Sequence, residues 1–135
     1  MEQIRRIAIP QLETGKGPFS NVVLDGTYAF VSGIVASDLE GGAAAHGDIG
    51  RETELVMTAI RDALAHVGIG MERILRVDVH MTDVGRMAEL DEVYVRFFSE
   101  GALPARTCTQ SGGLAGGSNV EITVMARGPS RQPPQ

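Results

Sequence analysis

The stretch Leu103–Ala126, LPARTCTQSGGLAGGSNVEITVMA, contains two short alternating runs joined by a glycine-rich connection. Alternation with a period of two is typical of half-buried β-strands and predicts strands at 105–111 and 119–127. The connection, Gly112–Gly117, is not a phosphate-binding loop, because no Lys-Ser/Thr pair and no helix follow it. We interpret it as a mobile hairpin connection that can border a cleft.

Three side chains of different chemistry, Arg106, Cys108 and Glu121, lie in this stretch. The guanidinium of Arg106 can hold a carboxylate through two parallel hydrogen bonds, although a structural ion pair would also explain an arginine on a strand. Glu121 can orient water and transfer protons, or it can be a solvated strand residue. Cys108 has no recognisable histidine partner, so we interpret it as a pocket wall rather than a nucleophile.

The rest of the chain alternates between strand and helix patterns. Period-two runs, the first followed by a proline and the middle two separated by Asp25-Gly26, predict strands at 4–9, 20–24, 27–35 and 74–81. Apolar residues at helical spacing predict helices over 51–67, with Gly68 as its C-cap, and from Asp83 to about Gly101. Gly33 interrupts its strand and indicates a bulge or a close approach to the backbone.

The element order β-β-β-α-β-α-β-β predicts an α+β fold with two helices packed on one face of a sheet. We expect a single domain over residues 1–127, followed by a proline-rich, disordered tail over 128–135. In the last strand Val120, Ile122, Val124 and Ala126 would face the helices. The opposite face is expected to carry a mixed polar set: Arg76, Asp78, His80, Arg106, Cys108, Gln110 and Glu121. Such a face favours contact with another subunit.

Composition excludes several classes of function. The 135 residues carry a net charge of −5, only 4% aromatic residues and no Trp, which argues against nucleic acid as a ligand. The three histidines lack zinc-ligand spacing, and no apolar run approaches the roughly 18 residues of a membrane helix. A single cysteine and an N-terminus without a signal-peptide pattern favour a cytoplasmic protein.

Placed on these strands, the sequence resembles the Rid family of reactive intermediate deaminases, also called YjgF-like or endoribonuclease L-PSP proteins. The resemblance runs from about Ile7 to Ala126 and includes the passage ALAHVGIGMERILRVDVHMTD. The shorter motifs that carry it are GPFS (17–20), VSG (31–33), VYVRFF (93–98), LPARTC (103–108) and VEITVMA (120–126). The resemblance implies a chorismate-mutase-like α+β fold with a mixed sheet. It also implies a homotrimer around a central barrel, with clefts between subunits.

The resemblance further implies a reaction without a cofactor. A 2-aminoacrylate-type enamine or imine would be hydrolysed to a 2-keto acid and ammonia. Arg106 matches the arginine that clamps the substrate carboxylate, and Glu121 matches the acid that positions or activates water. The other residues that match the family's pocket are Phe19 at its mouth, Ser32 and Gly33 on a strand whose backbone contacts ligand, and Cys108 in its wall.

Four departures from the family pattern bear on the substrate. Phe19 stands where Tyr is frequent, Asp91 where Asn is common, and Ile34 where a polar residue often follows the Ser-Gly pair. The glycine-rich connection also differs from the usual one. Two alternatives therefore stay open. One is a catabolic deaminase of another unsaturated amino acid, aminomuconate- or 3-aminoacrylate-like, and the other is a non-catalytic trimer that binds a keto acid or a protein partner.

Overall fold

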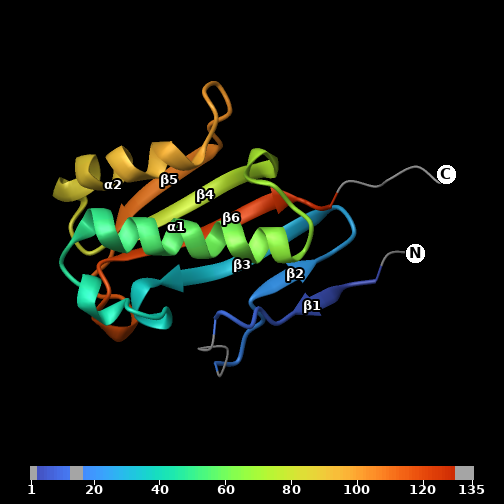
Figure 1. Ribbon diagram of the computed structural model, residues 1–135, viewed down its shortest axis with the longest axis horizontal. Coiled ribbons are helices and arrows are strands. Elements are labelled where there is room, and N and C mark those ends of the chain that lie inside the picture. The colour runs from blue at the N-terminus through green and yellow to red at the C-terminus, as the bar shows by residue number, and fades with distance from the viewer. Residues whose placement is uncertain (1–2, 13–16, 130–135) are drawn as a thin grey trace.

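The computed structural model describes residues 3–12 and 17–129, and these form one mixed sheet with two α-helices on one of its faces (Figure 1). The helices are α1 (Ile49–His66) and α2 (Met87–Tyr94). The strands are β1 (Arg5–Ile7), β2 (Val22–Leu24), β3 (Tyr28–Val35), β4 (Ile74–Met81), β5 (Ala105–Gln110) and β6 (Val120–Arg127). Their order across the sheet is β1-β2-β3-β6-β4-β5, and only the β4–β5 pair is parallel. The predicted α+β fold is confirmed.

The β2–β3 hairpin forms at the predicted Asp25-Gly26 turn. The carboxylate of Asp25 accepts hydrogen bonds from the backbone N–H groups of Thr27 and Tyr28, at 2.9 and 2.7 Å. These bonds lower the pKa of Asp25, with Tyr28 as the larger contributor. Together they fix the tight connection that sets the register of the two strands.

Helix α1 begins at Ile49, two residues before its predicted start at residue 51. Asp48 is the N-cap, and its side chain accepts a hydrogen bond from the N–H of Arg51. At the other end, Gly68 has φ of +79°, the left-handed conformation in which many helices terminate. The C-cap itself is Val67, one residue before the predicted Gly68, which is the left-handed residue directly after the cap. The buried stripe includes Ile60 and Leu64, both fully inaccessible, which pack on the sheet.

Helix α2 is shorter than predicted. It covers only Met87–Tyr94, with 3₁₀ turns at Val84–Arg86 and Val95–Phe97. Asp83 caps the first of these turns, through a bond from the N–H of Gly85, rather than the α-helix itself. Beyond Val95–Phe97 the backbone becomes extended at Phe98, so the helix ends well before Gly101. Leu90 and Tyr94, one turn apart, provide its fully packed contacts with the core.

The core lies between the helices and the sheet. As predicted, Val120, Ile122, Val124 and Ala126 of β6 face the helices and are buried. In β4, period-two alternation predicts Leu75 on the same side as Val77, Val79 and Met81, and this is wrong for Leu75. A register shift between Ile74 and Arg76 leaves Leu75 40% exposed and buries Ile74 instead. Burying one such aliphatic side chain stabilises the fold by about 1.5–3 kcal/mol.

Within the described residues, no helix combines the length and the apolar character needed to cross a membrane.

The glycine-rich connection between β5 and β6 is not a hairpin, so that interpretation was wrong. Strand β4 lies between β5 and β6, and the connection must cross the end of β4. It is held at two points: Ser37 donates through its hydroxyl to the carbonyl of Ala115, at 3.2 Å, and through its N–H to the hydroxyl of Ser118, at 3.1 Å.

Of the predicted C-terminal tail, the structure describes only the first residues. Gly128 still belongs to the hydrogen-bonded end of the β3–β6 pair: its N–H donates to the carbonyl of Thr27, and its own carbonyl accepts from the guanidinium of Arg73. Residues 130–135 of that tail lie outside the described part of the chain.

Candidate active site

The two residues proposed to share a site, Arg106 and Glu121, lie on opposite faces of the sheet. Arg106 in β5 is the register partner of Val77 in β4, and Val77 faces the helices. Glu121 in β6 is the register partner of His80, which faces the open side together with Asp78. Cys108 and Gln110 follow Arg106 onto the helix side, as the partners of Val79 and Met81. The expectation of one shared polar face was therefore wrong for β5.

The error has a physical cause in the composition of β5. In its sequence, ARTCTQ, both faces of the strand carry polar side chains. No apolar face therefore fixes which side turns toward the core. The parallel pairing with β4 decides the matter, because register partners project to the same face of a sheet. On the open side, Thr107 and Thr109 contact Arg76 and His80.

Arg106 packs against α2 and is held there by contacts of three kinds. Its Nη1 donates to Oδ1 of Asp91 at 2.6 Å, and its Nη2 lies 3.8 Å from the sulfur of Met87. Its guanidinium carbon lies 4.9 Å from the centre of the Tyr94 ring, in cation–π geometry. Burial opposes the charge on Arg106, but the hydrogen bond and negative charge of Asp91 outweigh it and raise the pKa of Arg106.

Cys108 lies beside this group and packs against the hydrophobic core. Burial raises the pKa of its thiol, and the nearby cation of Arg106 opposes that shift without cancelling it. A raised pKa keeps the side chain as the neutral thiol at neutral pH, and the thiol is a poor nucleophile. This agrees with the interpretation of Cys108 as a wall residue.

Glu121 lies directly over Gly33 on the open face. A Cβ atom placed on Gly33 would be 2.9 Å from Cδ of Glu121 and 3.1 Å from its Oε2. Gly33 lies in the register irregularity between Val31 and Ile34, which confirms the predicted bulge. In the same irregular segment, Ser32 donates from its hydroxyl to the carbonyl of Ser20, at 2.6 Å. The absent side chain of Gly33 therefore leaves the space in which the carboxylate of Glu121 lies.

Replacing Gly33 with Ala is expected to displace the Glu121 carboxylate while the fold stays intact. The backbone of Gly33 is not in the left-handed region, so alanine is tolerated there, but its methyl group overlaps Cδ of Glu121. If Glu121 acts on substrate, we expect a roughly 10–100-fold loss of activity, as a misplacement of about 1 Å produces. Steady-state kinetics and a thermal melt would measure both effects.

Gly112→Ala is the matched control, because a Cβ at Gly112 meets nothing within 4 Å. Equal losses in the two variants, or a Gly33→Ala protein with full activity, would contradict a role for the position of Glu121.

Phe19 lies in the segment before β2 and is 50% exposed. In the described part of the chain, no ring contact or hydrogen bond joins its side chain to Arg106 or Glu121. The predicted residues thus form two separate groups within one chain: Arg106 and Cys108 beside α2, and Glu121 with Gly33 and Ser32 on the open face and its bulge.

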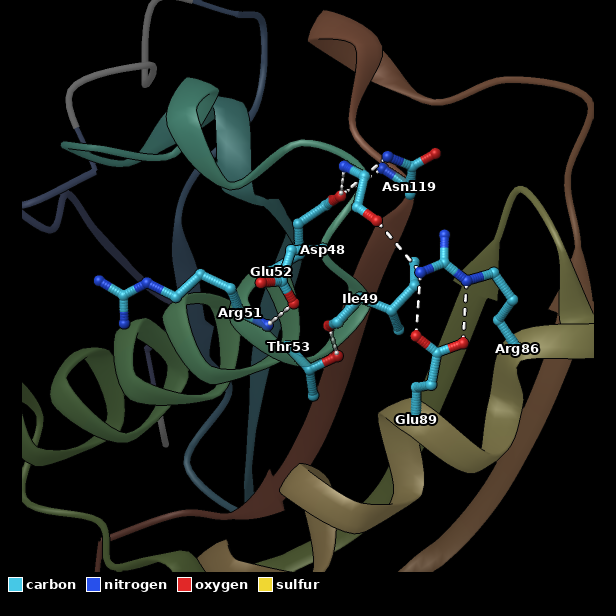
Figure 2. A network of polar contacts seen from close by, with 9 residues as sticks. Asp48, Ile49, Arg51, Glu52, Thr53, Arg86, Glu89 and Asn119 are labelled. Carbon is cyan, nitrogen blue, oxygen red and sulfur yellow. Dashed lines mark hydrogen bonds and ion pairs between the residues drawn. The ribbon is translucent and has the colours of Figure 1, made fainter.

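A buried carboxylate that the sequence did not point to fixes the start of β6. Glu52 is completely inaccessible and accepts three hydrogen bonds, from the N–H and the side-chain amide of Asn119, both at 2.8 Å, and from the N–H of Gly47, at 3.1 Å. Figure 2 shows Glu52 of α1 reaching Asn119, in a network with Arg86 and Glu89. Asn119 immediately precedes Val120 and Glu121, so this network positions the strand that carries Glu121. The available signal was an acid in the first turn of a helix.

No group of His, Cys, Asp or Glu side chains within residues 3–12 and 17–129 is arranged to hold a metal ion. Arg106 and Glu121, the two residues predicted to act on substrate, are each presented from a strand.

A six-stranded mixed sheet with two helices on one face and an arginine and a glutamate on its last two strands defines a class of small α+β proteins. The profile described as Endoribonuclease L-PSP matches residues 11–127, so the chain belongs to this family, whose members are also called Rid or YjgF proteins. A protein called DfrA, from Myxococcus xanthus, is 35% identical over 93% of this chain and 98% of its own. The 2-iminobutanoate/2-iminopropanoate deaminase of Bos taurus is 28% identical over 82% of this chain and 80% of its own.

Solved structures show the same fold. A Rid-family protein from Yersinia pestis superposes with a TM-score of 0.85 at 22% identity, over 93% of this chain and 99% of that one. A YjgF-family member from Neisseria meningitidis superposes with a TM-score of 0.76 at 23% identity, over 96% and 98%. At these identities the likeness concerns the fold alone.

Proposed function

We propose that the chain is a cofactor-independent deaminase that hydrolyses a 2-aminoacrylate-type enamine or its imine to a 2-keto acid and ammonia. The observation that carries the proposal is the partly exposed guanidinium of Arg106 beside α2, together with the carboxylate of Glu121 that lies over Gly33 on the open face. Relatives named 2-iminobutanoate/2-iminopropanoate deaminase, at 28 and 29% identity, support the reaction class.

The site is made by two chains. Because Arg106 and Glu121 project from opposite faces, a small substrate cannot touch both within one subunit. Arg106 of one subunit and Glu121 of a neighbour would meet where the open face of one sheet lies against the rim of another. The homotrimer implied by the resemblance provides such clefts.

The open face carries apolar groups that fit this assembly. Phe30 is 41% exposed there, and the register pairs it with Met125 of β6. Exposed large apolar side chains among polar neighbours are typical of surfaces that another chain covers.

The chemistry needs only these groups and water. Arg106 holds the substrate carboxylate with its free N–H donors, which places the iminium carbon at a fixed distance. Glu121 accepts a proton from water while the water oxygen bonds to that carbon, giving a tetrahedral amino alcohol. Glu121 then passes that proton to the nitrogen, the C–N bond breaks, and ammonia leaves as the hydroxyl returns its proton to the Glu121 carboxylate and becomes the keto group. Such proton transfer typically contributes ~10²–10⁴ in rate.

One observation favours the second candidate, an enzyme of the same type that acts on a different unsaturated amino acid. The Arg106 guanidinium is already bonded to Asp91, so the site differs in charge from one in which the arginine is alone. Comparison of rates on 2-aminoacrylate, 3-aminoacrylate and an aminomuconate would separate the two candidates, because the leading one predicts the highest kcat/KM on 2-aminoacrylate.

The deciding experiment supplies 2-aminoacrylate generated in situ and follows formation of pyruvate. We expect acceleration over buffer in the wild-type protein and a loss of roughly 10²–10³ in kcat/KM for Arg106→Ala, because two charge-assisted hydrogen bonds are removed.

Arg61→Ala is the matched control for this experiment. Arg61 also lies over an aromatic ring, that of Phe97 at 5.7 Å, and beside an acid, Asp62, but on the outer side of α1. Its activity should be unchanged. A wild-type protein that binds pyruvate but turns nothing over would indicate the non-catalytic keto-acid-binding trimer.

A further inference from the structure

The guanidinium proposed to bind the substrate carboxylate already has a carboxylate beside it. Asp91 lies 2.6 Å from Nη1 of Arg106, and the side chains of Arg106 and Asp91 are 23% and 48% exposed. Solvent therefore reaches both members of the pair. A ligand that contacts Arg106 also meets Asp91.

The contacts around Arg106 leave a defined part of it free. Asp91 takes one N–H of Nη1, and the Met87 sulfur, a weak acceptor, lies near Nη2. The Tyr94 ring covers one face of the guanidinium at 4.9 Å. No further acceptor is bonded to this guanidinium within the described residues, and an arginine has five N–H donors. A ligand carboxylate can therefore bind edge-on, in the plane of the guanidinium and next to Asp91.

An arginine beside an aspartate presents donors and an acceptor side by side, with no net charge. A 2-keto acid brings only acceptors, its carboxylate and its keto oxygen, and both are repelled by the Asp91 carboxylate. A 2-iminium acid or an amino acid brings a carboxylate for Arg106 and an adjacent cationic N–H group for Asp91. Complementary placement of both charges distinguishes the two ligands.

We infer that Asp91 is a specificity-determining residue that makes the Arg106 site prefer zwitterionic ligands, with a cationic nitrogen next to a carboxylate, over 2-keto acids. The inference rests on the proposed function, in which Arg106 binds the substrate carboxylate. The same preference bears on the reaction. Hydrolysis replaces the C=N bond by C=O, so the product has no cationic nitrogen for Asp91 to hold. Its keto oxygen is instead repelled by the Asp91 carboxylate. The product is thereby released.

Calorimetric titration with two unreactive probes tests the inference: pyruvate as the keto acid and L-alanine as the zwitterion. The variant is Asp91→Asn, which keeps an oxygen acceptor for Arg106 and removes the charge. We expect pyruvate to bind roughly 3–10-fold more tightly and L-alanine to bind 3–10-fold more weakly, because an exposed charge acts through partial solvent screening. Structural damage would lower the affinity for both probes, so affinity shifts in opposite directions distinguish a change in specificity from damage.

Glu92→Gln is the matched control. It removes the same charge one residue along α2, from a side chain that is 76% exposed and points toward Arg96 at 3.7 Å. Both affinities should stay within about twofold, as expected for a surface charge. An equal change in Glu92→Gln would overturn the inference, as would shifts of the same sign, or no shift, in Asp91→Asn. A wild-type protein that binds neither probe would overturn it too.

The pyruvate-formation assay separates this test from that of the proposed function. Turnover that depends on Arg106, combined with probe affinities that Asp91→Asn does not shift in opposite directions, leaves the function standing and removes the role of Asp91. Opposite shifts without turnover support the role of Asp91 and remove the deaminase.

Discussion

A one-to-one mixture of Arg106→Ala and Glu121→Gln chains, unfolded and refolded together, is expected to regain activity that neither variant has alone. The two residues face opposite sides of one sheet, and in the proposed function each site combines Arg106 of one chain with Glu121 of another. Random assembly leaves about a quarter of such two-chain sites with both wild-type residues, since each position has an even chance. Pyruvate formation should therefore reach about a quarter of the wild-type rate.

Each variant refolded by itself is the control for this mixture, and native mass spectrometry would verify that mixed assemblies form. Inactive mixtures that demonstrably contain both chains would place the complete site within a single subunit, or remove Glu121 from it. A Glu121→Gln protein with wild-type activity would show directly that Glu121 is not part of the site.

The Glu52→Gln variant is expected to be much less stable than the wild-type protein. The carboxylate of Glu52 accepts hydrogen bonds from two groups of Asn119 and from the N–H of Gly47. A glutamine would turn an NH₂ group toward at least one of these donors, in a position that no water reaches. The loss of a charge-assisted bond and the unsatisfied donors are expected to lower the free energy of unfolding by about 2–4 kcal/mol. Chemical denaturation of the assembled protein would measure it.

Glu54→Gln serves as the matched control, because Glu54 lies in the same helix but is half exposed and pairs with Arg51, which is also exposed. Its effect should stay within about 0.5 kcal/mol. Equal destabilisation of both variants would show that Glu52 acts through helix charge rather than through its bonds to Asn119. The Glu52→Gln variant should also lose activity, since Asn119 sets the start of the strand that carries Glu121.

Sequence-based prediction succeeded for features that residues close in sequence determine, and it failed for features that depend on other parts of the fold. The Asp25-Gly26 hairpin and the buried face of β6 depend on residues close in sequence, and both predictions are confirmed. The end of α1 depends on local residues too, and it lies just before the predicted Gly68. The extent of α2 and the inward side of β4 at Leu75 were predicted wrongly. Both depend on where the chain bends before it joins the next strand of the sheet.

For the site, the sequence pointed to Arg106, Cys108 and Glu121, but it gave no means of placing them relative to each other. It did not indicate that Asp91 would bond to Arg106 or that Glu52 would hold Asn119. Each of these pairs joins separate elements, and no period or motif in the chain relates them.

The fold class and the chemical groups could be predicted from the sequence, because periodicity, turn residues and side-chain identity are properties of the chain. That Arg106 faces α2 while Glu121 faces the open side follows only from the way the strands pair in the folded chain. The reason is the register of β5, an edge strand without an apolar face, which is set by its parallel pairing with β4 and not by its own residues.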